Sequence, residues 1–386
     1  MGSYKDIYES ALKEWGKQNY DKSIEFLEES MRLAGISNDT FFVNKSLNEI
    51  EIKKKKTNLV SMPRVIHVTL TSRCNMKCPF CYLDRYAGIW DMPEEVCEEI
   101  TGLFPYLQHL TWQGGEAFLH PSFRKMILRT IDFPNIRQTL LTNGSFLDEG
   151  WLDLFLRIPK FTIVISLESA KKDTYEALRK GGNFDRLKKN LFLINSLSQD
   201  NGNKFNLLVN IIIMKRNYLE VEEMIDFAIE NKFNHIILTP LYANGSEFYD
   251  KEYLPPDGEG VREYFSRLMP RMTEKTKMNN VYLDDRFTGI GKEDASSGTH
   301  GDCSATLDEA ICLSPWQQLF IESTGEVKSY CSCVHSLGNL KDSSIKEIWN
   351  GRLLGQLREN ILNYDYHSCN PICVGGLLDK SNLRME

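Results

Sequence analysis

The chain has 386 residues, 42% of them hydrophobic, and is long enough for one large domain with smaller ones beside it. Its 46 lysines and arginines against 53 aspartates and glutamates give a formal net charge of −7, which argues against a nucleic acid as the main partner, because binding to its backbone needs basic surface. The N-terminus lacks the pattern of a secretory signal, and no window reaches the roughly 18 apolar residues of a membrane-spanning helix. We therefore expect a cytoplasmic protein without a membrane partner, whose ten cysteines are reduced and bind metal.

Residues 1–57 are predicted to form a helical hairpin and a linker. Two apolar stripes at helical spacing consist of Tyr8, Leu12, Trp15, Ile24, Leu27 and Met31. The stretch from Gly16 to Tyr20, followed by Ser23 and Ile24, resembles part of a tetratricopeptide unit, and a single repeat cannot bury the continuous core of a solenoid. We expect the hairpin to dock a partner, to cap the next domain or simply to pack, and we expect the polar segment Ser37–Thr57 to be the linker.

Residues 58–243 are predicted to form a parallel sheet, because short apolar runs alternate with helical stretches. The six expected strands are Val65–Leu70, His109–Gln113, Gln138–Thr142, Phe161–Leu167, Asn206–Met214 and His235–Pro240. The expected helices are Pro93–Phe104, Ser122–Phe133, Asp148–Arg157, Asp173–Leu197 and Tyr218–Asn231. Functional groups in barrels of this kind gather at the carboxyl ends of the strands, so residues that directly follow strands should share one mouth.

Three cysteines follow the first strand at CxxxCxxC spacing: Cys74, Cys78 and Cys81. A four-iron cluster normally takes four thiolates, so three leave one iron free to bind a chelating molecule. A structural zinc ion usually takes four protein ligands, and no fourth histidine or cysteine lies close by in the sequence. Half of a zinc ribbon, or chance in a cysteine-rich chain, stays open as an alternative.

The segment from Thr71 to Tyr82, with the aromatic Phe80 before the third cysteine, resembles the signature of the radical SAM superfamily, and the likeness extends over residues 65–243. The resemblance implies an α/β fold, a partial (β/α)6 TIM barrel. It also implies a [4Fe-4S] cluster on the three cysteines with one iron open to S-adenosylmethionine (SAM), and reductive cleavage of SAM to a 5′-deoxyadenosyl radical that abstracts a substrate hydrogen. An electron donor such as flavodoxin or ferredoxin is the implied partner.

Contacts to SAM are expected at two further places. Gly114 and Gly115, after the second strand, let backbone approach a ligand closely, and Glu116 offers a carboxylate. By similarity to the family's GGE motif, these three should meet the methionine amino group. Ser166 and Glu168 alternate along the fourth strand and so share one face. They match the ribose-contacting position of the family, whose members often carry Asp where Glu168 stands, and a cap at the strand end is the alternative.

Residues 244–302 are expected to complete the barrel with connecting loops around a helix near Val261–Met272, because both flanks are rich in Gly, Asp, Asn and Ser. Arg179 and Asn210 are weaker candidates for the site, and we assign them no role.

Residues 303–386 resemble the SPASM domain or its shortened Twitch form, with a hairpin signal at Ser323–Gly325 and a helix expected at Ser344–Asn360. Thiolates from a hairpin and a later loop would converge when metal holds them together, which stabilises a small domain with little apolar core. The ligands expected for one auxiliary [4Fe-4S] cluster are Cys312, Cys331, Cys369 and Cys373.

One auxiliary cluster is expected rather than two. The full SPASM pattern carries seven cysteines and binds two clusters, whereas this chain has six from Cys303 onward and has Leu377 after Gly375 and Gly376. Cys303 and Cys333 stay unassigned. Cys303 could instead be a thiol that gives a hydrogen atom to a substrate radical, which would make the enzyme an epimerase.

The sequence thus predicts a radical SAM enzyme, an oxidoreductase in which the auxiliary cluster accepts an electron or positions the substrate. The helical hairpin slightly favours a peptide or protein side chain as the substrate. A dehydrogenase or epimerase of a sugar-like small molecule is the alternative, and a zinc-binding interaction protein is the alternative of another class. We assign no catalytic residue.

Overall fold

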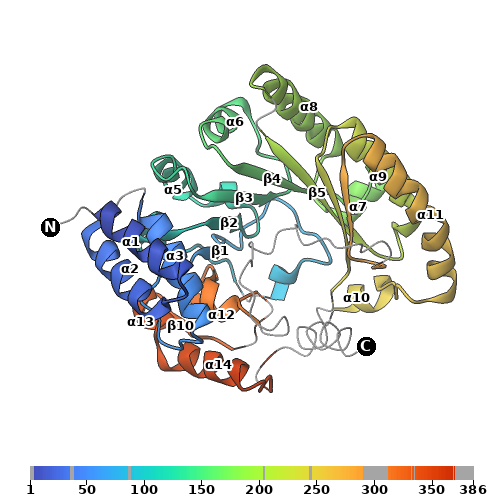
Figure 1. Ribbon diagram of the computed structural model, residues 1–386. Coiled ribbons are helices and arrows are strands. Elements are labelled where there is room, and N and C mark those ends of the chain that lie inside the picture. Colours follow the sequence, from blue (N-terminus) through green and yellow to red (C-terminus); the bar gives the residue numbers. More distant parts are fainter. Residues whose placement is uncertain are drawn as a thin grey trace.

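The computed structural model describes residues 4–34, 39–85, 88–202, 205–242, 246–289, 312–331, 333, 335–367 and 369. Its strands are β1 (Val65–Thr69), β2 (His109–Gln113), β3 (Arg137–Thr142), β4 (Phe161–Ser166), β5 (Asn206–Ile213), β6 (His235–Pro240), β7 (Tyr282–Asp285), β8 (Gln318–Ile321), β9 (Glu326–Lys328) and β10 (Gly338–Asn339). All ten lie in one sheet, in the order β10-β9-β8-β1-β2-β3-β4-β5-β6-β7. Figure 1 shows this sheet as an open arc, which confirms the predicted partial barrel.

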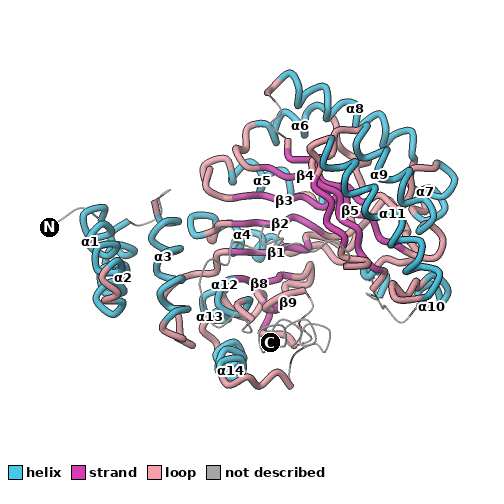
Figure 2. Tube along the Cα trace, turned by 45° about the vertical axis from the view of Figure 1, so that its right-hand side comes forward, coloured by secondary structure: helices cyan, strands magenta, loops and turns pink. Residues whose placement is uncertain are grey.

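The helices are α1 (Tyr4–Gly16), α2 (Tyr20–Ala34), α3 (Thr40–Lys53), α4 (Glu94–Gly102), α5 (Phe123–Thr130), α6 (Glu149–Leu156), α7 (Lys172–Leu178), α8 (Phe184–Asp200), α9 (Val221–Glu230), α10 (Glu247–Glu252), α11 (Glu259–Met278), α12 (Ser314–Gln317), α13 (Ile345–Trp349) and α14 (Arg352–Leu362). Helices α5, α6, α8 and α9 cover the outer side of the arc (Figures 1 and 2). No helix in the described ranges combines the length and the hydropathy needed to cross a membrane.

The six predicted strands are confirmed to within one residue at each end. Each is rich in β-branched and aromatic residues, and alternate side chains enter the core beneath the helices. Trp112 illustrates this packing, because it is fully buried and its indole donates to Gln138 Oε1 at 2.9 Å. Burying such a ring contributes on the order of 2 kcal/mol, and the hydrogen bond avoids the cost of a buried unpaired donor.

The prediction of a linker at Ser37–Thr57 is wrong, because most of it is helix α3. One side of α3 joins α1 and α2 in a small apolar cluster that contains Leu27 and Leu47. Two asparagines on α3 form hydrogen bonds to backbone outside the helical cluster: Asn44 donates to Met62 O at 3.1 Å, and Asn48 donates to Trp316 O at 2.7 Å. Polar residues that satisfy backbone groups at an interface look in sequence like a solvated linker, which explains the error.

The C-terminal segment extends the barrel sheet, because β8 pairs in parallel with β1 from Val65 to Val68. The predicted hairpin is confirmed as the antiparallel pair β8–β9. At the other edge β7 pairs in parallel with β6, so the parallel part of the sheet is two strands wider than predicted.

Two helices that the sequence predicts as continuous are interrupted at glycines. The expected helix Asp173–Leu197 divides into α7 and α8 around Gly181, which has φ +88°. The expected helix Ser344–Asn360 divides into α13 and α14 at Gly351, where a Cβ would lie 2.9 Å from Glu347 O.

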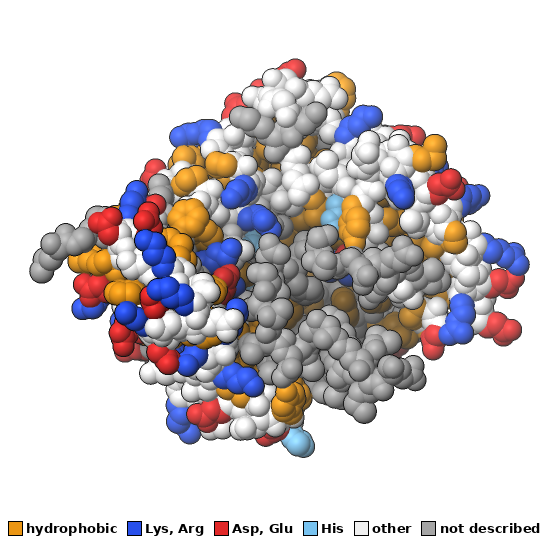
Figure 3. Space-filling model, in the orientation of Figure 1, with side chains coloured by type: hydrophobic (Ala, Val, Ile, Leu, Met, Phe, Trp, Pro, Cys, Tyr) orange, Lys and Arg blue, Asp and Glu red, His pale blue; other side chains and the backbone are white. Residues whose placement is uncertain are grey.

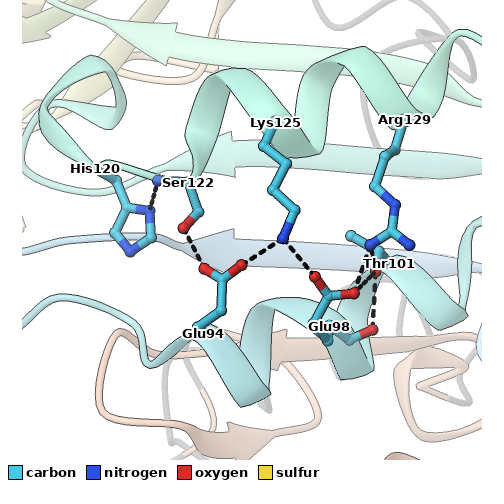
Figure 4. Close-up of polar contacts among 7 residues, drawn as sticks. All are labelled: Glu94, Glu98, Thr101, His120, Ser122, Lys125 and Arg129. Atoms are coloured by element: carbon cyan, nitrogen blue, oxygen red, sulfur yellow. Dashed lines mark hydrogen bonds and ion pairs between the residues drawn. The ribbon is translucent and has the colours of Figure 1, made fainter.

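Surface ion pairs join α4 to α5 (Figure 4). Lys125 Nζ lies 2.6 Å from Glu94 Oε1 and 2.8 Å from Glu98 Oε1, and Arg129 also pairs with Glu98. Exposed pairs of this kind contribute little to stability. On the face drawn in Figure 3, charges of both signs are mixed over the N-terminal helices.

Candidate functional site

The loop that carries Cys74, Cys78 and Cys81 leaves the carboxyl end of β1 and folds back over the loop after β2. Backbone hydrogen bonds hold the two loops together: Gly115 donates to Thr71 O at 2.7 Å, and Glu116 donates to Arg73 O at 2.8 Å. The cysteine loop is therefore fixed to its neighbour just before the first cysteine.

The two glycines after β2 are needed for this contact. A Cβ built on Gly114, which has φ +148°, would lie 2.5 Å from Thr71 O, and one on Gly115 would lie 2.2 Å from Arg73 O. Real Cβ atoms essentially never approach backbone oxygen so closely. Both glycines thus make room for the backbone of the cysteine loop, and their contact with the methionine amino group stays a prediction.

Glu116 lies in the loop after β2 and is buried, with 1% of its surface exposed. Its carboxylate accepts a hydrogen bond from Thr142 Oγ1 at 2.8 Å and one from the Asn143 amide at 2.9 Å. Burial raises the pKa of Glu116 to about 7, and these two hydrogen bonds oppose that rise. In this structure Glu116 joins the loop after β2 to the end of β3.

A pH dependence of stability follows from Glu116. Its folded-state pKa of about 7 lies above the ordinary value of 4.5, so the unfolded chain loses this proton first and wild-type stability falls as the pH rises from about 4.5 to 7. The loss is up to about 3 kcal/mol, because each tenfold difference in ionisation is worth ~1.4 kcal/mol. Urea unfolding of the metal-free protein at pH 5 and pH 8 should show this loss relative to Glu116→Gln, which cannot ionise. A stability difference between the two proteins that does not change with pH would contradict the effect.

Nitrogen donors surround two of the three thiols. The Met76 amide lies 3.4 Å from Cys74 Sγ, and Asn143 Nδ2 lies 3.8 Å from the same sulfur. Arg179 Nη1 lies 3.6 Å from Cys78 Sγ. Burial raises the pKa of Cys78 to about 11, with Arg179 opposing that rise and charge on Glu168 and on the other two cysteines adding to it. Without metal this thiol is therefore neutral, and binding of metal would release its proton.

Glu168 lies two residues beyond the end of β4 and is fully buried. Its carboxylate forms a two-point ion pair with Arg179, in which Nη2 donates to Oε1 at 2.8 Å and Nε donates to Oε2. Ser166 ends β4 and stands opposite Asn210 of β5. The structure thus directs Glu168 at Arg179, and the ribose contact of Ser166 and Glu168 stays a prediction.

The face of the sheet opposite the helices is mixed in character. On β1 and β2 it carries histidines: His67 Nε2 lies 3.3 Å from Gln318 Oε1, and His109 Nε2 lies 2.9 Å from Thr139 Oγ1. On β4 to β6 it carries a separate apolar cluster of Val164, Leu208 and Ile237. A molecule held against this face would meet polar groups on one side and apolar groups on the other.

The cysteine loop offers the donor set that an iron–sulfur cluster takes, namely three thiols with N–H groups directed at two of them. In a four-iron cluster each thiolate binds a different iron, so the sulfurs stand farther apart than around one zinc ion. Among the described residues, no three His, Cys, Asp or Glu side chains come close enough together to hold one ion. N–H donors to two of the sulfurs are also the groups that stabilise ligated thiolates.

The predicted auxiliary ligands are only partly described. The Cys369 amide donates to Tyr366 O at 2.9 Å. Burial raises the pKa of the Tyr366 hydroxyl, and charge on Cys312 and on Cys369 adds to that rise. Cys331 is exposed in the turn after β9. Cys373 and the unassigned Cys303 lie outside the described residues.

Two family models match the chain. Residues 68–228 match the radical SAM superfamily, and residues 312–374 match SPASM, an iron-sulfur cluster-binding domain. The chain is a radical SAM protein with a SPASM domain. Its cofactors are accordingly SAM and [4Fe-4S] iron–sulfur clusters. The predicted family resemblance and kinds of cofactor are thus confirmed, the number of auxiliary clusters stays a prediction, and the zinc alternative is disfavoured.

Relatives of known name are distant. The chain is 23% identical to GTP 3′,8-cyclase of Clostridium botulinum over 56% of its own length and 68% of that protein, and 22% identical to AdoMet-dependent heme synthase of Methanosarcina barkeri over 78% and 86%. It is also 25% identical to an uncharacterized protein of Archaeoglobus fulgidus, of whose length it matches only 52%.

Solved structures share the fold. Streptococcus suis SuiB bound to S-adenosylmethionine has a TM-score of 0.59 and 19% identity, covering 89% of this chain and 80% of SuiB. The structure of anSMEcpe with bound AdoMet has a TM-score of 0.55 and 21% identity, covering 76% and 83%. At this level of identity the similarity establishes the fold alone.

Proposed function

We propose that the protein is a radical SAM oxidoreductase that abstracts a hydrogen atom from a peptide or protein side chain. Cys74, Cys78 and Cys81 would hold the first [4Fe-4S] cluster, and Cys312, Cys331, Cys369 and Cys373 would hold one auxiliary cluster. When bound, the first cluster and SAM supply a 5′-deoxyadenosyl radical. The observation that carries the proposal is the cysteine loop at the mouth of an open parallel barrel, with N–H donors directed at two of its three sulfurs.

The protein's own part is to position and to shield. Glu116 and the glycines hold the cysteine loop against β2 and β3. The inner face of the sheet offers a polar wall near His67 and an apolar wall near Val164, which suits a side chain presented on an amide backbone. A site closed to water protects a reactive radical from side reactions.

A peptide substrate is supported by two observations. One of the similar structures is SuiB bound to its precursor peptide SuiA, with a TM-score of 0.58. The helices α1 and α2 add a unit beside the barrel that could hold a peptide. A sugar-like or nucleotide substrate is the second candidate, favoured by the match to GTP 3′,8-cyclase. We propose a reducing cytoplasmic setting, because the cysteine ligands of the clusters must be reduced thiols. Flavodoxin or ferredoxin would supply the electron for the cleavage of SAM.

Deuterium transfer tests the proposal. The reconstituted enzyme, reduced with dithionite, should release 5′-deoxyadenosine, and a deuterated substrate should pass deuterium into it. Mass spectrometry of 5′-deoxyadenosine over a set of deuterated peptides and sugar derivatives then identifies the substrate class. Deuterium from a sugar derivative but from none of the peptides would overturn the peptide assignment, and a protein that binds stoichiometric zinc and makes no 5′-deoxyadenosine would overturn the whole proposal.

A further inference from the structure

Arg179 occupies an unusual position between the cysteine loop and the barrel. Its side chain is only 11% exposed, forms the two-point ion pair with Glu168, and directs Nη1 at Cys78 Sγ from 3.6 Å. Its guanidinium carbon also lies 5.3 Å from the ring centre of Phe80, two residues beyond Cys78. Arg179 therefore contacts the cysteine loop at two points while a buried carboxylate holds it in place.

Backbone contacts also hold the loop of Arg179 close to the cysteine loop. The Lys77 amide donates to Lys180 O at 2.7 Å, and a Cβ on Gly181 would lie 2.9 Å from Asn75 O. The residues beside Arg179 and beside Cys78 are thus joined directly. The distance between guanidinium and thiol is fixed by backbone as well as by the ion pair.

A buried charge beside a cluster ligand has a predictable effect. One-electron reduction adds a negative charge to the cluster, so a nearby positive charge favours the reduced form and a nearby carboxylate opposes it. Arginine cannot lose its proton in a protein, so its charge is permanent. Glu168 is fully buried and offsets that charge from the side away from the sulfur.

We propose that the buried Arg179–Glu168 ion pair sets the reduction potential of the first cluster through the Cys78 thiolate. The inference rests on the proposed function, since it needs a cluster on Cys78. It makes Arg179 and Glu168 positioning residues for the cluster, separately from any contact that Glu168 makes with SAM.

The test is an EPR-monitored redox titration of the reconstituted protein without SAM, so that SAM binding cannot contribute. Glu168→Gln leaves the arginine charge unopposed and should raise the potential above that of the wild type. Adding Arg179→Gln to that variant removes the charge and should bring the potential down again. We expect the ratio of reduced to oxidised cluster at fixed potential to differ about tenfold between the single and double variants, which corresponds to ~59 mV for one electron.

Arg216→Gln provides the control, because Arg216 also pairs with a carboxylate, that of Glu252, at the same end of the sheet, but its side chain is 46% exposed and lies over the ring of Phe248 rather than beside a cysteine. Its potential should equal that of the wild type. Potentials of the single and double variants within twofold of each other in this ratio would overturn the inference. If the double variant fails to assemble its cluster, Glu168→Gln alone decides, since an unchanged or lower potential contradicts the proposal. Iron content and 5′-deoxyadenosine formation by the wild type test the proposed function independently.

Discussion

Replacing Cys74, Cys78 and Cys81 together by alanine is expected to abolish formation of 5′-deoxyadenosine and to leave iron in the C-terminal domain. Three thiolates bind the first cluster in the proposed arrangement, and no other described cysteine, histidine or carboxylate stands ready to replace them as part of a metal site. The rate of 5′-deoxyadenosine formation should fall by more than about a thousandfold, as is typical when an essential catalytic group is removed. Iron and sulfide analysis with product chromatography after anaerobic reconstitution provides the measurement.

Cys97→Ala is the control for this experiment. Cys97 is 2% exposed within α4, and burial raises the pKa of its thiol to about 12. The thiol is therefore neutral and packs as a small apolar side chain in the core. This variant should keep both its iron and its activity. Undiminished 5′-deoxyadenosine from the triple variant, or equal loss from Cys97→Ala, would remove the three cysteines from their proposed role.

Gly115→Ala should prevent assembly of the first cluster although it touches no cysteine. The added methyl group would lie 2.2 Å from Arg73 O, and that oxygen belongs to backbone that is itself bonded to Glu116. Overpacking against fixed backbone costs roughly 3 kcal/mol or more, enough to displace the loop that carries Cys74. Iron content should fall by about one cluster per chain, and the midpoint of urea unfolding should fall with it.

Gly260→Ala is the matched substitution. Gly260 lies in α11, and a Cβ there would meet nothing within 4 Å. The change should leave iron content as in the wild type and should stabilise the fold by about 0.5–1 kcal/mol, since alanine loses less conformational freedom in a helix. A Gly115→Ala protein with full iron content would show that the loop tolerates the methyl group, against our reading of the packing.

The fold could be predicted largely from local patterns. Short apolar runs separated by helical stretches were enough to locate β1 to β6, because the apolar residues of a buried strand are contiguous in its own sequence. Pairing between distant segments leaves no such mark: nothing in residues 318–321 indicates that they extend the sheet beside β1. Helix α3 was missed for a related reason, since Asn44 and Asn48 look solvated until the backbone groups they serve are known.

The site divides in the same way. Cys74, Cys78 and Cys81 form a contiguous motif inside the range that matches the radical SAM family model, and their role in starting the chemistry stays a prediction. Arg179 has no motif of its own in the sequence, because its importance comes from Glu168 and from a sulfur that lies about a hundred residues earlier in the chain. A Gly181–Gly182 pair follows it closely in the sequence. It marks the close approach of two loops rather than a ligand.

The parallel pairing of β8 with β1 also bears on how the protein can be dissected. A fragment that ends before Leu313 would lack β8, so that Val65–Val68 of β1 would become an edge strand with unpaired backbone donors and acceptors. Such an edge invites pairing with another chain, so a barrel cloned without its C-terminal part should aggregate. The SPASM segment thus supplies the strand that borders the barrel sheet at β1. Experiments on either the barrel or the SPASM segment should therefore keep the two together.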